Sequence, residues 1–176
     1  MGQATLFPHA WGKLRRRCSD AWPDAVLALA DHAADVAAVT AALLDLPSVR
    51  ARLCALAGAE ITDDQRAAMT GAAFLHDIGK ANRGFWGKQR PPAERVGSPI
   101  AGHVREAAPL LFRPFGGRAI AIPDAGAFLK PATSAGMLLL AALGHHGEPV
   151  SCASLSGEAS RHAALWQPVE GYDPVA

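Results

Sequence analysis

Apolar residues recur at helical spacing along most of the chain, and this pattern predicts an all-α fold. The first long helix is expected over residues 24–46, before Pro47 ends it. One stripe of that helix consists of four aliphatic side chains and one histidine: Leu29, His32, Val36, Val39 and Leu43. His32 is therefore expected to face inward, where its imidazole needs a polar partner that a metal ion, a carboxylate or a water molecule could provide.

Four further segments also have helical patterns. Their predicted limits are residues 48–58, 62–78, 98–112 and 133–147. Gly58 and Gly79 are expected to stop the first two of these helices, and Thr62 or Asp63 to cap the second. The last of the four is apolar on nearly all faces and therefore belongs in the centre of the domain.

Glycine and proline are concentrated in the segments predicted to be irregular, which are residues 1–23, 80–97 and 113–132. Residues after 148 have the pattern of a weak helix followed by a loop. No stretch alternates apolar and polar residues long enough to predict a substantial sheet. We therefore predict a compact bundle of five to seven helices.

The histidines indicate a site for two metal ions. Five of the seven lie in apolar segments or at their ends: His32, His76, His103, His145 and His146. Asp77 follows His76 directly, in the last turn of the helix predicted over residues 62–78. Imidazole is the commonest protein ligand of divalent first-row metals, and a carboxylate can bridge two ions. Any one of these histidines alone is more often a hydrogen-bonded core residue. Five of them with an aspartate favour a paired-metal site.

The segment directly after this pair is basic and aromatic. Residues 80–97 contain one acidic residue and five basic ones, which are Lys80, Arg83, Lys88, Arg90 and Arg95. Phe85 and Trp86 lie among them. Such a loop is typical of a track for single-stranded nucleic acid, where basic residues contact phosphates and aromatic rings stack on bases. The residues predicted to bind the strand are Arg83, Trp86, Lys88 and Arg90. A solvated surface loop is the alternative.

Composition places few limits on the function. The formal net charge is +1, so affinity for nucleic acid has to come from a local patch. Three cysteines at wide spacings argue against a disulfide framework or a structural zinc site and indicate a reducing compartment. The sequence lacks the pattern of a secretory signal, and its longest apolar run is far shorter than the roughly 20 residues of a membrane span. We therefore predict a soluble, cytoplasmic protein with no membrane partner.

The order of the motifs resembles that of a known family. The motifs are His32, the run HDIGK that begins at His76, the pair GH that ends at His103, and the run HHG that begins at His145. This order is similar to that of the HD metal-dependent phosphohydrolase superfamily. Within it, HDIGKANRGFW together with the later HHG resembles the HD nuclease domain of the CRISPR-associated helicase-nuclease of type I systems. The resemblance extends over residues 11–147.

This resemblance implies a metal-dependent nuclease that hydrolyses phosphodiester bonds of single-stranded DNA in type I CRISPR interference. The implied partners are an RNA-guided CRISPR surveillance complex and a helicase domain or subunit. Asp77 and Lys80 match catalytic residues of the family, with Lys80 near the phosphate. The implied ligands of the first metal are His32, His76 and Asp77, and those of the second are Asp77, His103, His145 and His146. Histidine-rich ligation favours manganese, iron, cobalt or nickel over magnesium.

The family pattern also contains a later aspartate that completes the first metal site, and we expect this chain to lack the helix that carries it. Asp173 is the only aspartate after HHG, and it lies in a loop-like segment. Residues 1–176 are therefore expected to be an HD nuclease domain without its C-terminal part and without a helicase. Two alternatives stay open. One is a phosphohydrolase acting on a nucleotide or cyclic nucleotide, and the other is a domain that binds a metal or a partner without turnover.

Overall fold

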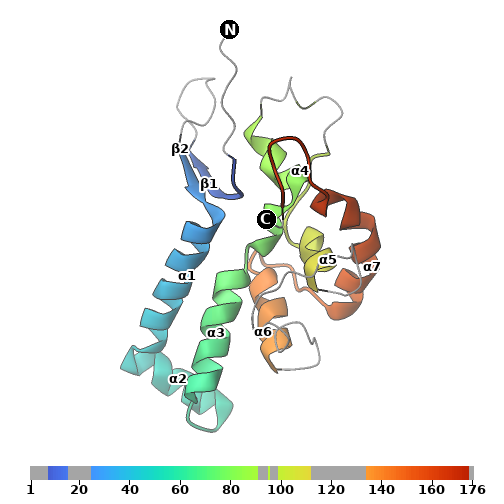
Figure 1. Cartoon of the computed structure of the whole chain (residues 1–176). Coiled ribbons are helices and arrows are strands. Elements are labelled where there is room, and N and C mark those ends of the chain that lie inside the picture. Colours follow the sequence, from blue (N-terminus) through green and yellow to red (C-terminus); the bar gives the residue numbers. More distant parts are fainter. Residues whose placement is uncertain (1–7, 16–24, 91–94, 96–98, 112–133, 175–176) are drawn as a thin grey trace.

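The computed structural model of the protein describes residues 8–15, 25–90, 95, 99–111 and 134–174 (Figure 1). Helices dominate this part of the chain, and seven of them are α-helices, which confirms the predicted all-α class. The strands are β1 (Trp11–Arg15) and β2 (Ala25–Ala28). The α-helices are α1 (Leu29–Leu44), α2 (Pro47–Ala57), α3 (Asp63–Leu75), α4 (Arg83–Trp86), α5 (Ala108–Leu111), α6 (Ser134–Leu143) and α7 (Cys152–His162). The 3-10 helices are η1 (Ile78–Ala81), η2 (Gly87–Gln89), η4 (Arg105–Ala107) and η5 (Ala163–Trp166).

A short antiparallel hairpin precedes the first helix, although the sequence pattern does not predict it. β1 pairs with β2 so that Trp11 lies opposite Ala28, and the Leu29 N–H donates to the Ala10 carbonyl at 2.9 Å. The prediction that residues 1–23 are irregular is therefore wrong for β1, and α1 begins later than expected. The run AVLALA is apolar at every position, so its pattern fits a strand as well as a helix. Pairing with β1 makes its first four residues a strand.

α1 and α3 lie side by side, and α2 connects them at the end away from the hairpin (Figure 1). Two of the predicted signals at the ends of these helices are confirmed, but Gly79 does not stop α3, which ends at Leu75, and lies instead within η1. Thr62 and Gln65 form a capping box in which each side chain accepts a hydrogen bond from the other residue's backbone N–H. Gly58 ends α2 with a φ of 67°, a left-handed conformation that favours glycine.

Only the first half of the apolar stripe predicted on α1 is buried. Leu29 and His32 are buried, whereas Val39 is 60% exposed and Leu43 is 49% exposed. Helical spacing shows which side chains share a face, but burial also needs a neighbouring element to cover that face. The prediction that the stripe faces inward is therefore confirmed at His32 and wrong at Val39 and Leu43.

The segment after Asp77 is packed into the core, so the prediction of an irregular loop over residues 80–97 is wrong for residues 80–89. These residues fold into η1, α4 and η2, between two buried clusters. The clusters consist of Trp11, Phe85, Trp86 and Tyr172, and of Leu29, Ala81, Leu165 and Trp166. Aromatic side chains bury large areas and stabilise the structure that covers them. Residues 91–94, 96 and 97 lie outside the described residues.

α6 contributes the main side chains of a third cluster, between α5 and α7. Leu139, Leu140 and Leu143 are buried there with Leu155 of α7, whereas Met137 is 58% exposed, so the central position predicted for this segment is confirmed for one face of the helix only. The helix itself is shorter than predicted, because it ends at Leu143. The two histidines that follow lie in a turn. Residues 113–132, predicted to be irregular, lie outside the described residues.

The helix predicted over residues 98–112 is regular only in its second half. η4 begins at Arg105 and α5 ends at Leu111, while His103 lies in the irregular segment before η4. Phe112, the last residue of the predicted helix, lies outside the described residues. Among the helices that the structure describes, none is both long and apolar enough to cross a membrane.

Candidate metal centre

His76 and Asp77 lie where the chain leaves α3. That helix ends at Leu75, and η1 begins at Ile78, so the pair follows the helix instead of lying in its last turn as predicted. Asp77 has a φ of −110° and a ψ of 10°, which ends the regular helix. Its side chain makes no capping hydrogen bond to η1. The carboxylate, 2% exposed, points instead toward side chains from other parts of the chain.

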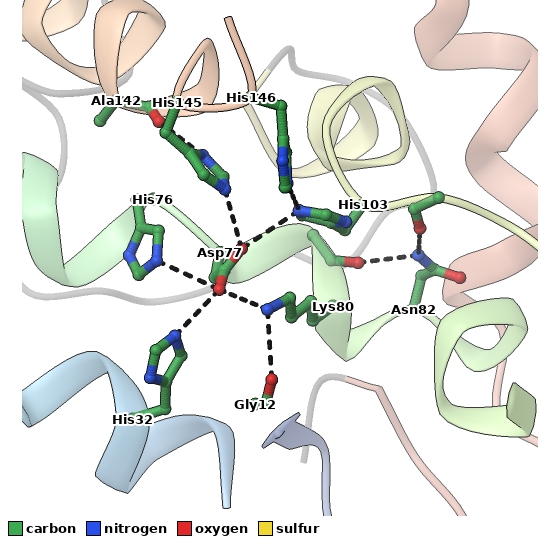
Figure 2. A network of polar contacts seen from close by, with 12 residues as sticks. Gly12, His32, His76, Asp77, Lys80, Asn82, His103, Ala142, His145 and His146 are labelled. Atoms are coloured by element: carbon green, nitrogen blue, oxygen red, sulfur yellow. Dashed lines mark hydrogen bonds and ion pairs between the residues drawn. The ribbon is translucent and has the colours of Figure 1, made fainter. Parts of the chain in front are cut away.

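One oxygen of the Asp77 carboxylate faces three nitrogen atoms (Figure 2). His32 Nε2, from α1, lies 3.1 Å from Oδ2, and His76 Nε2 lies 3.1 Å from the same oxygen. The Lys80 ammonium, from η1, lies 2.5 Å from it. Residues 45 positions apart in the chain therefore meet at one carboxylate oxygen.

The other carboxylate oxygen faces a second group of histidines. His103 Nε2 lies 3.2 Å from Asp77 Oδ1, and His145 Nε2 lies 3.5 Å from it. His146 Nε2 is 3.0 Å from His103 Nε2 (Figure 2). Oδ1 is buried, and it forms no hydrogen bond with any of the described residues. Oδ1 is thus an acceptor that lacks a hydrogen-bond partner and lies among imidazole nitrogens.

These contacts define two ligand sets that share a carboxylate. The first set is His32, His76 and Asp77, and the second set is His103, His145 and His146. Within each set the possible ligand atoms lie within 4.8 Å of one another, which is compact enough for one divalent ion. An oxygen without a hydrogen bond, placed among imidazoles, also fits a bound cation. The structure therefore brings together all six residues that the sequence indicates as metal ligands.

Backbone carbonyls orient two of the imidazoles. His76 Nδ1 donates to the Ala73 carbonyl at 2.7 Å, and His145 Nδ1 donates to the Ala142 carbonyl at 2.9 Å. A neutral imidazole that donates from Nδ1 has its lone pair on Nε2, and Nε2 is the atom that faces Asp77 in both residues. The same arrangement is general among metal-binding histidines. It prepares both side chains to bind an ion without a change of tautomer.

Electrostatics keep the carboxylate charged and two imidazoles neutral. Burial acts to raise the pKa of Asp77, but the imidazoles of His103 and His76 and the Lys80 ammonium beside the carboxylate outweigh it and hold that pKa well below its usual range. Burial, reinforced by the nearby Lys80 charge, lowers the pKa of His32. Burial also lowers the pKa of His145. The centre thus combines an anion with neutral imidazoles, which is the protonation state that metal binding requires.

Lys80 lies inside the centre. It is 8% exposed, and its ammonium donates to Asp77 Oδ2 and, at 3.2 Å, to the Gly12 carbonyl of β1. β1 passes so close that a Cβ at Gly12 would lie 2.5 Å from His32 Cβ. The family resemblance implies that Lys80 approaches a substrate phosphate, whereas here its ammonium balances the charge of Asp77.

The four residues predicted to bind a nucleic-acid strand differ in how they are placed. Trp86 is 3% exposed, and its ring stacks on Tyr172 with centroids 4.6 Å apart, so the prediction of a ring open to bases is wrong. Lys88 Nζ lies 4.3 Å from the centroid of the Phe85 ring. Arg90 Cζ lies 5.6 Å from the centroid of the Trp86 ring. Both cations therefore lie over the faces of buried aromatic rings, in cation–π contacts.

Arg83 and Arg95 complete this basic region. Arg83 is half-buried, and its Nε makes no hydrogen bond with the described residues. Arg95 donates from Nε to the Arg90 carbonyl at 2.7 Å and from an Nη to the Lys88 carbonyl at 2.6 Å. Arg95 therefore holds the backbone on which two of the predicted strand-binding residues are placed.

Two residues near the centre, Asn82 and Glu106, are not among the predicted site residues. Asn82 is completely buried, and its Oδ1 accepts the Phe85 N–H at 2.9 Å as the cap of α4. An asparagine before a short helical segment is a recognisable capping signal. Glu106 Oε1 accepts the Gly102 N–H at 2.7 Å. No local pattern marks that contact, because it depends on how the segment before η4 folds back.

An aspartate enclosed by histidines from α1, the end of α3, the segment before η4 and the turn after α6 defines a metal-dependent phosphohydrolase of the HD type. The sequence model of the family described as "Cas3, HD domain" matches residues 11–173, and the chain belongs to this family. Membership confirms the predicted resemblance and makes the chain a metal-dependent HD phosphohydrolase or nuclease. No curated protein and no solved structure matches the chain.

Proposed function

We propose that the chain hydrolyses phosphodiester bonds of single-stranded DNA at a two-metal centre bridged by Asp77. The observation that carries this proposal is the division of the carboxylate, with Oδ2 facing His32 and His76 and Oδ1 facing His103 and His145. Divalent ions held there would supply an activated water molecule and would stabilise the charge of the phosphate. Manganese, iron, cobalt or nickel suits these imidazole-rich sets better than magnesium.

Exposure supports an approach of the phosphate from the second set. His145 and His146 are exposed, whereas His32 is buried and Asp77 is nearly inaccessible. The first set would hold an ion among buried and half-buried side chains, and the second set would hold one beside exposed histidines. Lys80 keeps the bridging carboxylate ionised and oriented from within the domain.

The choice of a single-stranded DNA substrate rests on the family and on the basic region after the centre. Arg83, Lys88 and Arg90 follow Asp77 within one short segment. The family also supports an RNA-guided CRISPR surveillance complex and a helicase as partners. Two alternative functions remain to be tested. One is a phosphohydrolase that acts on a nucleotide or cyclic nucleotide, and the other is a domain that binds metal or a partner without turnover.

The first test compares metal content with activity. The wild-type protein, Asp77→Ala and His103→Ala are loaded with Mn²⁺, and their metal-to-protein ratios and hydrolysis of single-stranded DNA, nucleotides and cyclic nucleotides are measured. Asp77→Ala should lose both metals and all hydrolysis, while His103→Ala should lose mainly the second metal. His162→Gln is the matched control, because this histidine pairs with Glu158 on α7, outside both ligand sets.

Each competing function gives a different result in this test. Faster turnover of nucleotides than of DNA would select the nucleotide phosphohydrolase. Bound metal without hydrolysis of any substrate would select the binding domain. If Asp77→Ala retained full turnover, the two-metal centre would have to be abandoned.

The second test measures the salt dependence of DNA binding in the presence of a chelator, so that no strand is cut. If Arg83, Lys88 and Arg90 bind phosphates, replacing all three with alanine should weaken binding. The slope of log affinity against log salt should also fall by about 0.7 for each phosphate that the variant no longer neutralises. Hydrolysis of a small chromogenic phosphodiester by the metal-loaded triple variant should change little.

The matched control removes three positive charges from the end of the domain around α2. Arg50, Arg52 and Arg66 lie there, and two of them pair with acidic residues, Glu60 and Asp45. Their replacement with alanine should leave the salt slope unchanged. Equal slopes in the two triple variants would show that the strand does not follow the segment after Asp77.

A further inference from the structure

His103 is the ligand of the second set that lies farthest from the end of a long helix. His145 and His146 follow the end of α6, and the first set lies on α1 and at the end of α3. His103 lies in the irregular segment of residues 99–104, before η4 begins. Its position therefore has to be fixed by contacts with other parts of the chain.

Two side chains hold the peptide group on either side of Gly102, directly before His103. The Gly102 carbonyl accepts a hydrogen bond from Asn82 Nδ2 at 2.8 Å. The Gly102 N–H donates to Glu106 Oε1 at 2.7 Å. Both backbone groups of this residue are thus bound by side chains, as strand residues are bound by a neighbouring strand.

Asn82 connects this segment to the residues after Asp77. Its Nδ2 also donates to the Gly79 carbonyl at 2.7 Å, so a single amide group binds two backbone segments. Those segments are in direct contact, because a Cβ at Gly79 would lie only 1.6 Å from the His103 carbonyl oxygen. Since η1 begins one residue after Asp77, the amide of Asn82 connects the segment that follows Asp77 with the segment that carries His103.

Glu106 is fixed in turn by η5. Its backbone carbonyl accepts the Trp166 Nε1–H at 2.8 Å, and Trp166 is buried. The backbone of Glu106, whose carboxylate accepts the Gly102 N–H, is therefore itself held by a hydrogen bond. Together the two contacts hold both backbone groups of Gly102, directly before His103.

We propose that Asn82 and Glu106 are positioning residues for the second ligand set, and that they act by holding the Gly102 peptide so that His103 Nε2 faces Asp77 Oδ1. This inference rests on the proposed two-metal centre. Metal sites tolerate displacements of only about 0.2 Å in ligand distance, so a released His103 segment should bind its ion poorly. Removal of an orienting partner typically lowers metal affinity by about 10-fold to 100-fold.

The test is a titration of chelator-treated protein with Mn²⁺, in which free Mn²⁺ is followed by electron paramagnetic resonance. The wild-type protein should show two classes of site. Glu106→Ala should weaken one class by about 10-fold to 100-fold and leave the other unchanged. Glu106→Gln retains an acceptor oxygen for the Gly102 N–H and should restore both classes. Asn82→Ser retains a cap for α4 but loses the amide donors, so it should behave like Glu106→Ala.

A second measurement separates this inference from the proposed function. In chelator, nuclear magnetic resonance of ¹⁵N-labelled histidine rings should show changed signals for His103 and His146 in Glu106→Ala and unchanged signals for His32. If these signals change although the wild-type protein binds fewer than two ions, the two-metal function fails and the positioning role stands. If neither the signals nor the affinities change, the positioning role is overturned. Equal weakening of both classes, or the same weakening in Glu106→Gln, would also overturn it, because it would indicate general structural damage.

Discussion

The ion pair between Asp77 and Lys80 allows a quantitative prediction for the protein without metal. Lys80 Nζ lies 2.5 Å from Asp77 Oδ2, and the two side chains are 10% and 2% exposed. Asp77→Asn removes the negative charge and leaves the ammonium buried without an anionic partner, beside the Gly12 carbonyl and 5.7 Å from the centroid of the Phe85 ring. Removing one member of a buried pair typically costs 3–5 kcal/mol, so we expect the free energy of unfolding to fall by about that amount. This is a large share of the roughly 5–15 kcal/mol of a typical domain.

The assay is urea unfolding in chelator, followed by the fluorescence of the four tryptophans. Asp77→Asn, Lys80→Met and the double variant complete a mutant cycle with the wild-type protein. The double variant should be more stable than Asp77→Asn, because it no longer buries an unpaired charge, and the coupling free energy should be about 0.5–3 kcal/mol. A cost below about 1 kcal/mol for Asp77→Asn, or a double variant no more stable than Asp77→Asn, would refute the reasoning.

The dependence of stability on pH gives a second test of the ion pair between Asp77 and Lys80. The pKa of Asp77 is lowered in the folded protein, so its charge stabilises the fold above the carboxyl pKa of the unfolded chain, about 3.9. That contribution is lost as the pH falls from about 4 toward the lowered pKa of Asp77. The difference in stability between wild-type protein and Asp77→Asn should therefore shrink below about pH 4.

Three further predictions concern the surroundings of the centre. Burial lowers the pKa of His32, so the unfolded chain binds its proton more readily, and the melting temperature in chelator should fall as the pH drops below about 6.5. Gly79→Ala should destabilise the protein by about 1–3 kcal/mol or more in urea unfolding and should weaken one class of Mn²⁺ site, because its Cβ would collide with the His103 carbonyl. Tyr172→Phe removes the hydrogen bond from the Tyr172 hydroxyl to the Ala81 carbonyl, 2.5 Å long, and should cost about 1 kcal/mol in urea unfolding while the stack on Trp86 is retained.

The sequence predicts those features that depend on local signals or on residue chemistry. Thr62 and Gly58 mark helix ends through the conformations and hydrogen bonds of their own neighbours. The inward position of His32 follows from helical spacing. The chemical preference of imidazole for metals, combined with family motifs, identifies residues far apart in the chain that the fold then brings together.

The sequence fails where a distant partner decides the structure. Trp86 lies in a basic segment that looks like an open loop, but Tyr172 stacks on its ring and Trp11 Nε1–H donates to its carbonyl at 3.2 Å. These partners are separated from it by more than 70 residues in either direction. His103 lies in a helical pattern, yet the segment that carries it is irregular, and the Asn82 amide, 20 residues before Gly102, binds the Gly102 carbonyl. Periodicity within a window cannot indicate such contacts.

The two ligand sets are unequal, and the inequality implies an order of loading. The first set has two imidazoles and the shared carboxylate, and the Lys80 ammonium already contacts the carboxylate oxygen on that side. The second set has three imidazoles, and the carboxylate oxygen on that side has no hydrogen-bond partner among the described residues. More ligands and the greater distance from a fixed positive charge both favour a cation at the second set. The tighter class in a Mn²⁺ titration should therefore be the one that depends on His103, and the weaker class should be the one that depends on His32.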